Sequence, residues 1–221
     1  MKKVNVLVAG ATGYIGLELI KILAKHPNIK IKYLCAKSSV GKNIQSFDKK
    51  LKNFKYLPKV SSIDNADLRK LDVVFTALPN GEAQNISKKL FNKTLLIDLS
   101  ADFRLTSSIS FKKWYKIKHK AKNLIKHSIY SIPELVNNID KYKIISCPGC
   151  YPTSIQIPLI PLLKKKLVKK KNIIVDSKSG YSGAGKNLHK KFKNKYIYES
   201  TSAYGVSGHR HLSELNQELF N

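Results

Sequence analysis

The chain has 221 residues and carries 41 lysines and arginines against 14 acidic residues, a formal net charge of +27. This length suits one large domain or two small ones, and no apolar run approaches the roughly 18 residues of a membrane span, so we expect a soluble, cytoplasmic protein. Its three cysteines are an odd number that suits no disulfide framework, which indicates a reducing compartment.

The positive charge comes almost entirely from lysines spread along the chain. Only Arg69, Arg104 and Arg210 are arginines, whereas proteins that read nucleic acid usually rely on the planar guanidinium group. A genome biased toward A/T codons produces such a Lys-, Ile- and Asn-rich composition without any binding role. We therefore expect no specific nucleic-acid partner and no membrane partner; a basic nucleic-acid-binding protein remains an alternative.

Strands and helices are expected to alternate over residues 1–148. Ile15, Leu19, Ile22 and Leu23 recur at helical spacing after a first strand, and Pro27 ends this helix. The Lys/Asn-rich segment 48–70 is interpreted as a surface excursion. Apolar runs predict strands over 4–9, 29–35, 73–78, 95–99 and 143–146, and a second helix near 83–91. This alternation predicts an α/β fold with a doubly wound, Rossmann-type parallel sheet.

The turn between the first strand and the first helix carries a G-x-x-G-x-x-G pattern. Such a turn lets the backbone approach a pyrophosphate, while the helix N-terminus offers free N–H groups and a positive dipole. The spacing differs from the commoner G-x-G-x-x-G, but its place in an α/β chain favours a dinucleotide site. The predicted cofactor-binding residues are Gly10, Ala11, Thr12, Gly13, Tyr14, Ile15 and Gly16.

The end of the second strand indicates which dinucleotide is bound. An acidic residue here would hold the ribose 2′-hydroxyl of NAD, and none is present. Lys37, Ser38 and Ser39 stand there instead, a cation and two hydroxyls suited to a 2′-phosphate. We therefore predict that the cofactor is NADP.

The pattern changes near residue 148, where we place a domain boundary. A helical run to about residue 167, a strand over 173–177, a glycine-rich loop and an amphipathic stretch from Ser213 indicate a second domain. We interpret residues 149–221 as the N-terminal part of an incomplete α+β catalytic and dimerisation domain. Pro158 lies inside the helical run, where it would remove a backbone hydrogen bond and cost about 3 kcal/mol unless the helix kinks.

Cys150 is the predicted nucleophile. Pro152 can start a helix, which would place the Cys150 sulfur at its electropositive N-terminal end, where a thiol pKa falls. Cys147 lies at the end of a strand with nothing obvious to activate it. A thioredoxin-like redox pair, a zinc site shared with His209 and His211, and two inert core cysteines are the alternatives. The zinc site lacks the usual H-x₃₋₅-H spacing, so we expect no metal.

A dinucleotide domain followed by such a thiol favours one chemistry. A thiolate can attack an activated acyl group or an aldehyde, and a nicotinamide exchanges hydride with the resulting adduct. This chemistry also needs a general acid/base and an anion clamp. His209, Arg210 and His211 supply both types of group just before a predicted helix.

Seven motifs, in order and over almost the whole chain, closely resemble those of the N-acetyl-γ-glutamyl-phosphate reductases of arginine biosynthesis. They are "VLVAGATGYIGLELIKIL", "TALPNGEA", "LIDLSADFRL", "YSIPEL", "PGCYPTS", "SGYSGAGK" and "YGVSGHRHLSEL". Two of them, "PGCYPT" and "GHRH", separate this family from the related aspartate-semialdehyde dehydrogenases.

The resemblance implies a role for each candidate residue. Cys150 would attack the acyl phosphate of N-acetyl-glutamyl phosphate, and NADPH would reduce the resulting thioester to the semialdehyde. His209 or His211 would act as the acid/base, or alternatively would only cap or orient the next helix. Arg104 and Arg210 would bind a substrate carboxylate or phosphate; for Arg104 a domain-internal salt bridge is the alternative.

The resemblance also concerns the rest of the chain. Ser182 and Gly183 belong to a loop that the family brings near the cofactor. Family members are homo-oligomers and run well beyond residue 221, with further strands in the catalytic domain. We therefore expect residues 1–148 to fold and bind nucleotide, and the isolated chain to be unstable beyond them, with little reductase activity. An inactive remnant that retains only nucleotide binding is the alternative.

Overall fold

The structure, a computed structural model, describes residues 2–90, 94–186 and 199–220. Its centre is a seven-stranded parallel sheet of order β3-β2-β1-β4-β5-β7-β6. The strand order reverses beside β1, which confirms the predicted doubly wound, Rossmann-type sheet. The strands are β1 (Val4–Ala9), β2 (Ile29–Cys35), β3 (Val60–Ser61), β4 (Val73–Thr76), β5 (Leu95–Asp98), β6 (Ser128–Tyr130) and β7 (Ile144–Ser146).

Helices pack on both faces of this sheet. The α-helices are α1 (Tyr14–Lys25), α2 (Glu82–Leu90), α3 (Ser108–Tyr115), α4 (Cys150–Lys164) and α6 (Leu212–Leu219). Successive residues of β1 point to opposite faces, so Val6 packs in one buried cluster with Ile20 of α1, and Leu7 in another with Leu90 of α2. In the described residues, no helix has the length and apolar character of a membrane span.

Helix α1 is confirmed, but its buried face differs from the predicted one. Ile15 and Ile22 are 54% and 67% exposed, and the face against the sheet is formed by Gly16, Leu17, Ile20 and Leu23. The rotation of the helix follows from Gly16, since a Cβ there would lie 2.2 Å from the carbonyl oxygen of Gly10. Close backbone contact at the turn therefore decides which apolar side chains are buried.

Segment 48–70 is more than the predicted surface excursion. It contains β3, which pairs with the end of β2, and the side chains of Leu51, Leu57 and Val60 belong to the buried cluster on the α1 face. The interpretation as a surface excursion was therefore wrong for its apolar residues. The lysines between them are solvated. Strand β3 has only two residues, which is too short to show an alternating pattern in the sequence.

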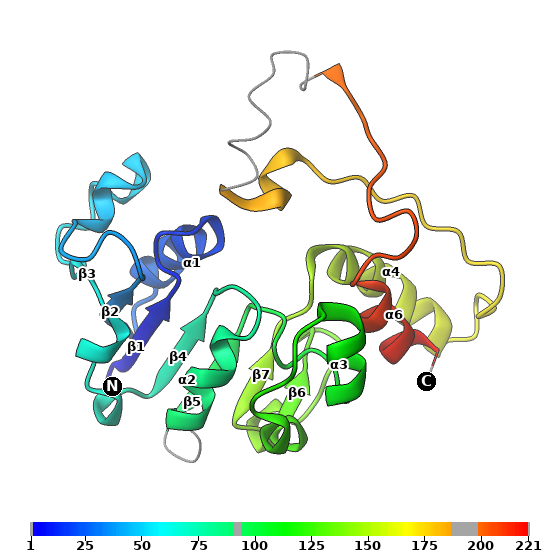
Figure 1. Cartoon of the computed structure of the whole chain (residues 1–221), viewed down its shortest axis with the longest axis horizontal. Coiled ribbons are helices and arrows are strands. Elements are labelled where there is room, and N and C mark those ends of the chain that lie inside the picture. Colours follow the sequence, from blue (N-terminus) through cyan, green and yellow to red (C-terminus); the bar gives the residue numbers. More distant parts are fainter. Residues whose placement is uncertain (1, 91–93, 187–198, 221) are drawn as a thin grey trace.

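The region after α4 also departs from expectation. Residues 173–177 form no strand, and Ile174 is 94% exposed, so the predicted strand was wrong. No neighbouring strand is described to which this run could pair its backbone. Figure 1 shows the segment instead as a long yellow loop that leaves α4, crosses above the sheet to the 3₁₀ turn η7 (Tyr181–Ala184) beside α1, and later returns to α6.

Candidate active site

The glycine turn after β1 is built for close approach of the backbone. Gly10 has φ +86°, and a Cβ on it would lie 2.2 Å from the carbonyl oxygen of Ala77 after β4. The N–H groups of Gly10 and Ala11 donate to the Cys35 carbonyl at 2.9 and 3.0 Å, which ties the turn to β2. Gly13 is the N-cap of α1. A bare backbone that leads into a helix N-terminus fits a dinucleotide pyrophosphate.

The side chains of this turn differ in accessibility. Ala11 is buried, whereas Tyr14 and Ile15 are exposed at the first residues of α1. Thr12 lies half-buried between them, directly before the N-cap. The turn can therefore contact a ligand through its backbone and through the first exposed side chains of the helix.

The predicted 2′-phosphate residues lie on the surface after β2. Lys37 and Ser38 are exposed, and Ser39 adopts φ +74° in the turn that follows. The Lys37 ammonium already forms an ion pair with Glu82 at the start of α2, at 2.7 Å. Sequence reasoning missed this partner because Glu82 lies 45 residues away in the chain.

Cys150 is exposed at the first residue of α4, as predicted, with Gly149 as the N-cap in an extended conformation. The Thr153 N–H and hydroxyl both donate to the Gly149 carbonyl, at 2.9 and 2.8 Å, and close the first turn of the helix. Helix α4 continues through Pro158 and Pro161 to Lys164. The thiol therefore stands exposed at the N-terminal end of the helix.

Cys147 is in a different environment from Cys150. Burial raises the pKa of the Cys147 thiol to about 11, and the nearby Asp98 carboxylate adds to this effect. Burial also raises the pKa of Cys35. All three cysteines are free, and the described residues include no group of three or more His, Cys, Asp or Glu side chains placed to hold a metal ion.

The two candidate histidines pack against the start of α4. A Cβ on Gly149 would lie 2.4 Å from His211 Nε2, so glycine at this position makes room for the imidazole. The His211 N–H donates to His209 Nδ1 at 3.2 Å, and the ring centroids lie 4.6 Å apart. Tyr151 touches both rings edge-on. The structure thus places both histidines beside the residues that flank Cys150.

Both histidines are neutral at neutral pH. Burial, and then the positive charge of Arg104, lowers the pKa of His211 to about 3. Burial and then Arg210 lower the pKa of His209. His211 Nδ1 is buried and has no hydrogen-bond partner among the described residues, while Arg210 is exposed at the surface.

Arg104 is buried and joins three parts of the chain. Its Nε donates to the Cys147 carbonyl at 2.9 Å, Nη2 to the Leu99 carbonyl at 3.3 Å, and Nη1 to Glu214 Oε1 at 3.1 Å. This arrangement corresponds to the salt-bridge alternative, although Glu214 lies in α6, beyond the predicted domain boundary. Substrate binding by Arg104 remains a prediction.

Glu214 is the functional-site residue that sequence reasoning missed. It is fully buried, and its second oxygen accepts from the Gly149 N–H at 2.9 Å and from the Tyr130 hydroxyl at 3.0 Å. Tyr130 in turn accepts from Gln156 Nε2 at 3.1 Å. A glutamate at helical spacing from His211 in a chain with few acidic residues was the only signal in the sequence.

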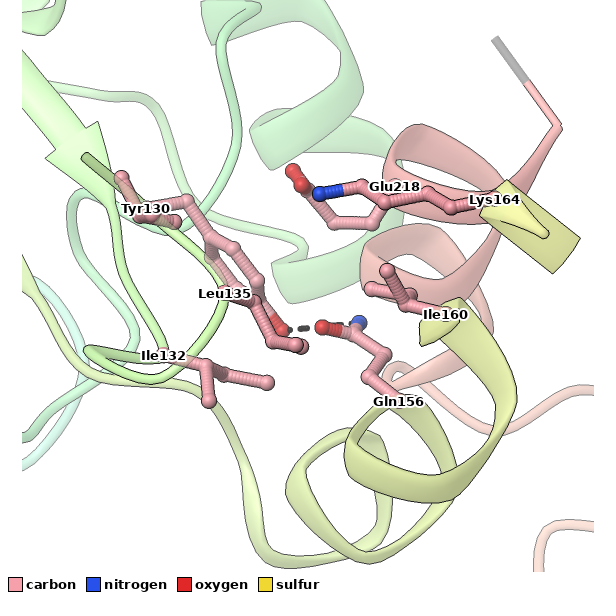
Figure 2. Close-up of a pocket in the computed structure, with 8 residues that line it drawn as sticks. Tyr130, Ile132, Leu135, Gln156, Ile160, Lys164 and Glu218 are labelled. Carbon is pink, nitrogen blue, oxygen red and sulfur yellow. Dashed lines mark hydrogen bonds between the residues drawn. The ribbon is translucent and has the colours of Figure 1, made fainter. Parts of the chain in front are cut away.

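A cavity of about 130 Å³ lies behind this network, between the end of β6 and helices α4 and α6. Figure 2 shows Tyr130 and Gln156 bonded to each other on its wall, with Ile132, Leu135 and Ile160 as apolar neighbours. None of its lining residues is one of the predicted catalytic or cofactor-binding residues. The candidate active site is therefore the exposed edge around Cys150 and not this cavity.

The loop that carries Ser182 and Gly183 reaches the glycine turn. It forms η7 (Tyr181–Ala184), and shortly after it the Lys186 ammonium donates to the Thr12 carbonyl at 2.7 Å. Ser182 and Gly183 themselves are exposed. The structure thus brings this loop beside the nucleotide turn, as the resemblance implies.

Two family models match the chain in sequence. Residues 5–142 match the semialdehyde dehydrogenase NAD binding domain, and residues 150–221 match the semialdehyde dehydrogenase dimerisation domain. The chain is 47% identical to an N-acetyl-gamma-glutamyl-phosphate reductase of Ehrlichia canis and 41% identical to a probable chloroplastic N-acetyl-gamma-glutamyl-phosphate reductase of Arabidopsis thaliana. These matches confirm the resemblance to that group of reductases.

The matches cover nearly all of this chain but only part of the relatives. They span 98% and 99% of the chain, and 63% and 54% of the Ehrlichia canis and Arabidopsis thaliana proteins. A probable aspartate-semialdehyde dehydrogenase from Pseudomonas aeruginosa has the same fold, with a TM-score of 0.54 and 16% identity over 97% of this chain and 66% of that one. The NADP complex of aspartate semialdehyde dehydrogenase from Candida albicans gives a TM-score of 0.50, with 22% identity over 74% of this chain and 48% of that one.

Proposed function

Since the chain belongs to the semialdehyde dehydrogenase family, we propose that it reduces N-acetyl-glutamyl 5-phosphate to N-acetyl-glutamate 5-semialdehyde with NADPH, in arginine biosynthesis. The observation that carries the proposal is the exposed Cys150 thiol at the N-terminus of α4, in a chain whose first part is a dinucleotide-binding domain. The names of the relatives support the choice of substrate. The dimerisation domain that residues 150–221 match supports a homo-oligomer.

Cys150 carries the covalent step. Its thiolate attacks the acyl carbon of the substrate, a C–S bond forms, and the C–O bond to the phosphate breaks, so that phosphate leaves with the electron pair. The exposed position of the sulfur at the start of α4 leaves it accessible to the substrate. Cys147 is unsuited to this role because burial keeps its thiol protonated at neutral pH. We expect it to be the bystander of the pair.

His209 or His211 handles the proton. NADPH, when bound, supplies the hydride that reduces the thioester. This reduction leaves a thiohemiacetal oxyanion on Cys150, which takes up a proton from solvent, and the resulting hydroxyl must lose that proton again as the C–S bond breaks and the aldehyde forms. A neutral imidazole can accept this proton, and both histidines are neutral because their pKa values lie below the ordinary range. Arg210, exposed beside them, is a second candidate besides Arg104 to bind a substrate anion.

NADP is favoured over NAD by the residues after β2. No carboxylate ends this strand, and Lys37, Ser38 and Ser39 can donate to a 2′-phosphate. The ion pair of Lys37 with Glu82 means that a 2′-phosphate competes with Glu82 for the ammonium. The pair is solvent-exposed, so this competition is weak.

Two measurements test the proposed function. With NADP, phosphate and N-acetyl-glutamate semialdehyde, the reverse reaction should produce NADPH, at the low rate expected of this chain, and Cys150→Ser should abolish it while Cys147→Ser retains it. Independently of turnover, iodoacetamide followed by peptide mass spectrometry should label Cys150 first. Preferential labelling of Cys147, or full activity of Cys150→Ser, would refute the assignment of the nucleophile.

The same assay separates the two histidines. His209→Asn and His211→Asn each remove one imidazole, and loss of the general acid/base should lower kcat by about 10²–10⁴-fold. The variant with the larger effect at an unchanged unfolding midpoint identifies the acid/base. Equal activity of both variants and the unchanged protein would leave the histidines as packing residues only.

A further inference from the structure

Lys186 connects the late part of the chain to the glycine turn. The segment that follows α4 crosses above the sheet and reaches α1 (Figure 1). There the Lys186 ammonium donates to the Thr12 carbonyl at 2.7 Å, across a sequence separation of 174 residues. The same nitrogen lies 5.6 Å from the ring centroid of Tyr14 and 5.7 Å from that of Phe47. Three contacts from two different segments of the first domain thus fix its position.

The Lys186 ammonium lies beside the start of α1. Thr12 directly precedes the N-cap of α1, a helix whose first turn has free N–H groups and no acidic residue. Within the described parts of the chain, Lys186 forms no ion pair with a carboxylate. An ammonium has three N–H donors, and the Thr12 carbonyl takes one of them. The remaining donors and the helix N-terminus would together suit an anion.

We propose that Lys186 is a ligand of the cofactor's pyrophosphate, which it would hold against the glycine turn. This inference rests on the proposed function, since it assumes that the turn binds a dinucleotide. The pyrophosphate is chosen over the 2′-phosphate because Thr12 and the α1 N-terminus are the parts of the turn that approach a pyrophosphate, whereas Lys37, Ser38 and Ser39 stand after β2. NADH and NADPH share the pyrophosphate, so Lys186 serves both.

Calorimetric titration with NADPH and with NADH tests this role without any turnover. Lys186→Met should weaken binding of both nucleotides by the same factor, about tenfold or more, as expected for loss of a charge-assisted hydrogen bond. Lys186→Arg should recover part of the affinity. Lys169→Met, an exposed lysine of the same loop, is the matched control and should change neither dissociation constant.

The possible outcomes separate the two proposals. Equal weakening of NADPH and NADH by Lys186→Met, with Lys169→Met unchanged, supports Lys186 as the pyrophosphate ligand. Unchanged binding of both nucleotides, or weakening of NADPH alone, overturns it while the proposed function stands. Failure of the unchanged protein to bind either nucleotide overturns the proposed function together with this inference. An unfolding midpoint within about 2 °C of the unchanged protein, roughly 1 kcal/mol or less, shows that Lys186→Met is folded.

Discussion

Replacing Glu214 by glutamine tests whether the buried ion pair with Arg104 holds the site together. Glutamine keeps the shape of the side chain but removes its charge and turns one of its two acceptor oxygens into a donor. In the folded protein those oxygens face the Arg104 guanidinium on one side and the Gly149 N–H and Tyr130 hydroxyl on the other. In either orientation of the glutamine amide, its NH₂ group would face another donor, either the Arg104 guanidinium or the Gly149 N–H.

The expected effect is large because both partners are buried. Glu214 is fully buried and Arg104 is 8% exposed, so the variant leaves an uncompensated charge inside the protein. Breaking such a pair costs about 3–5 kcal/mol. For a chain of this size each kcal/mol lowers the unfolding midpoint by about 2–4 °C, so the midpoint of Glu214→Gln should fall by roughly 6–20 °C.

Thermal unfolding followed by circular dichroism measures this change. Glu134→Gln is the control, since Glu134 is exposed and its loss should change stability by about 0.5 kcal/mol or less. The double variant Arg104→Met with Glu214→Gln removes both charges and should be more stable than the two single effects predict in sum. A loss below about 1 kcal/mol in Glu214→Gln would refute the view that this pair is a main link between α6 and the first domain.

Three further outcomes follow from the geometry. Iodoacetamide should label Cys150 fast near neutral pH. Cys147 should react only as the pH approaches 11, because burial raises the pKa of its thiol to about that value. Equal labelling rates of the two cysteines at pH 8 would contradict this prediction. Gly10→Ala should destabilise by about 1–3 kcal/mol because its Cβ would overlap a carbonyl oxygen, whereas Gly41→Ala, at a similar φ but in open space, should cost less. Burial raises the pKa of Asp102 to about 6, so as the pH rises the Asp102 side chain loses its proton in the unfolded chain before it does so in the folded protein. The contribution of Asp102 to stability should therefore fall as the pH rises from about 4 to 6. Urea titrations across that range measure the free energy of unfolding, and a rise in stability there that Asp102→Asn leaves unchanged would contradict the prediction.

Local patterns predicted the parts of the fold that depend on neighbouring residues. The runs at 4–9 and 29–35 became β1 and β2 without a change of boundary, because apolar residues that are nearly continuous in the first and alternate with lysines in the second are both typical of strands. The same rule failed at 173–177, where an apolar run has no described strand beside it to pair with. β3 and β6, with two and three residues, are too short to show a period.

The candidate site also contains residues whose positions could be predicted from the sequence and residues whose positions could not. The position of Cys150 at a helix start could be predicted because the proline and glycine signals lie within three residues of it. The burial of Glu214 could not, since a glutamate is ordinarily exposed and its partner lies 110 residues earlier. The position of Lys186 could not be predicted either, since its partner Thr12 lies 174 residues earlier and Lys186 is one of 41 basic residues, which are mostly on the surface.

The contact between Arg104 and Glu214 also has a consequence for the order of folding. The sheet and helices α1 and α2 can form from segments near one another in the chain, whereas α6 must close a loop of 110 residues before its glutamate meets the arginine. Closing that loop costs entropy before the buried contacts of α6 can form and compensate for it, so we expect the docking of α6 to be a late step. We therefore expect the nucleotide-binding sheet to exist before the surroundings of Cys150 do. A partly folded chain would then already have the glycine turn of its cofactor site while its thiol still lacks an organised environment.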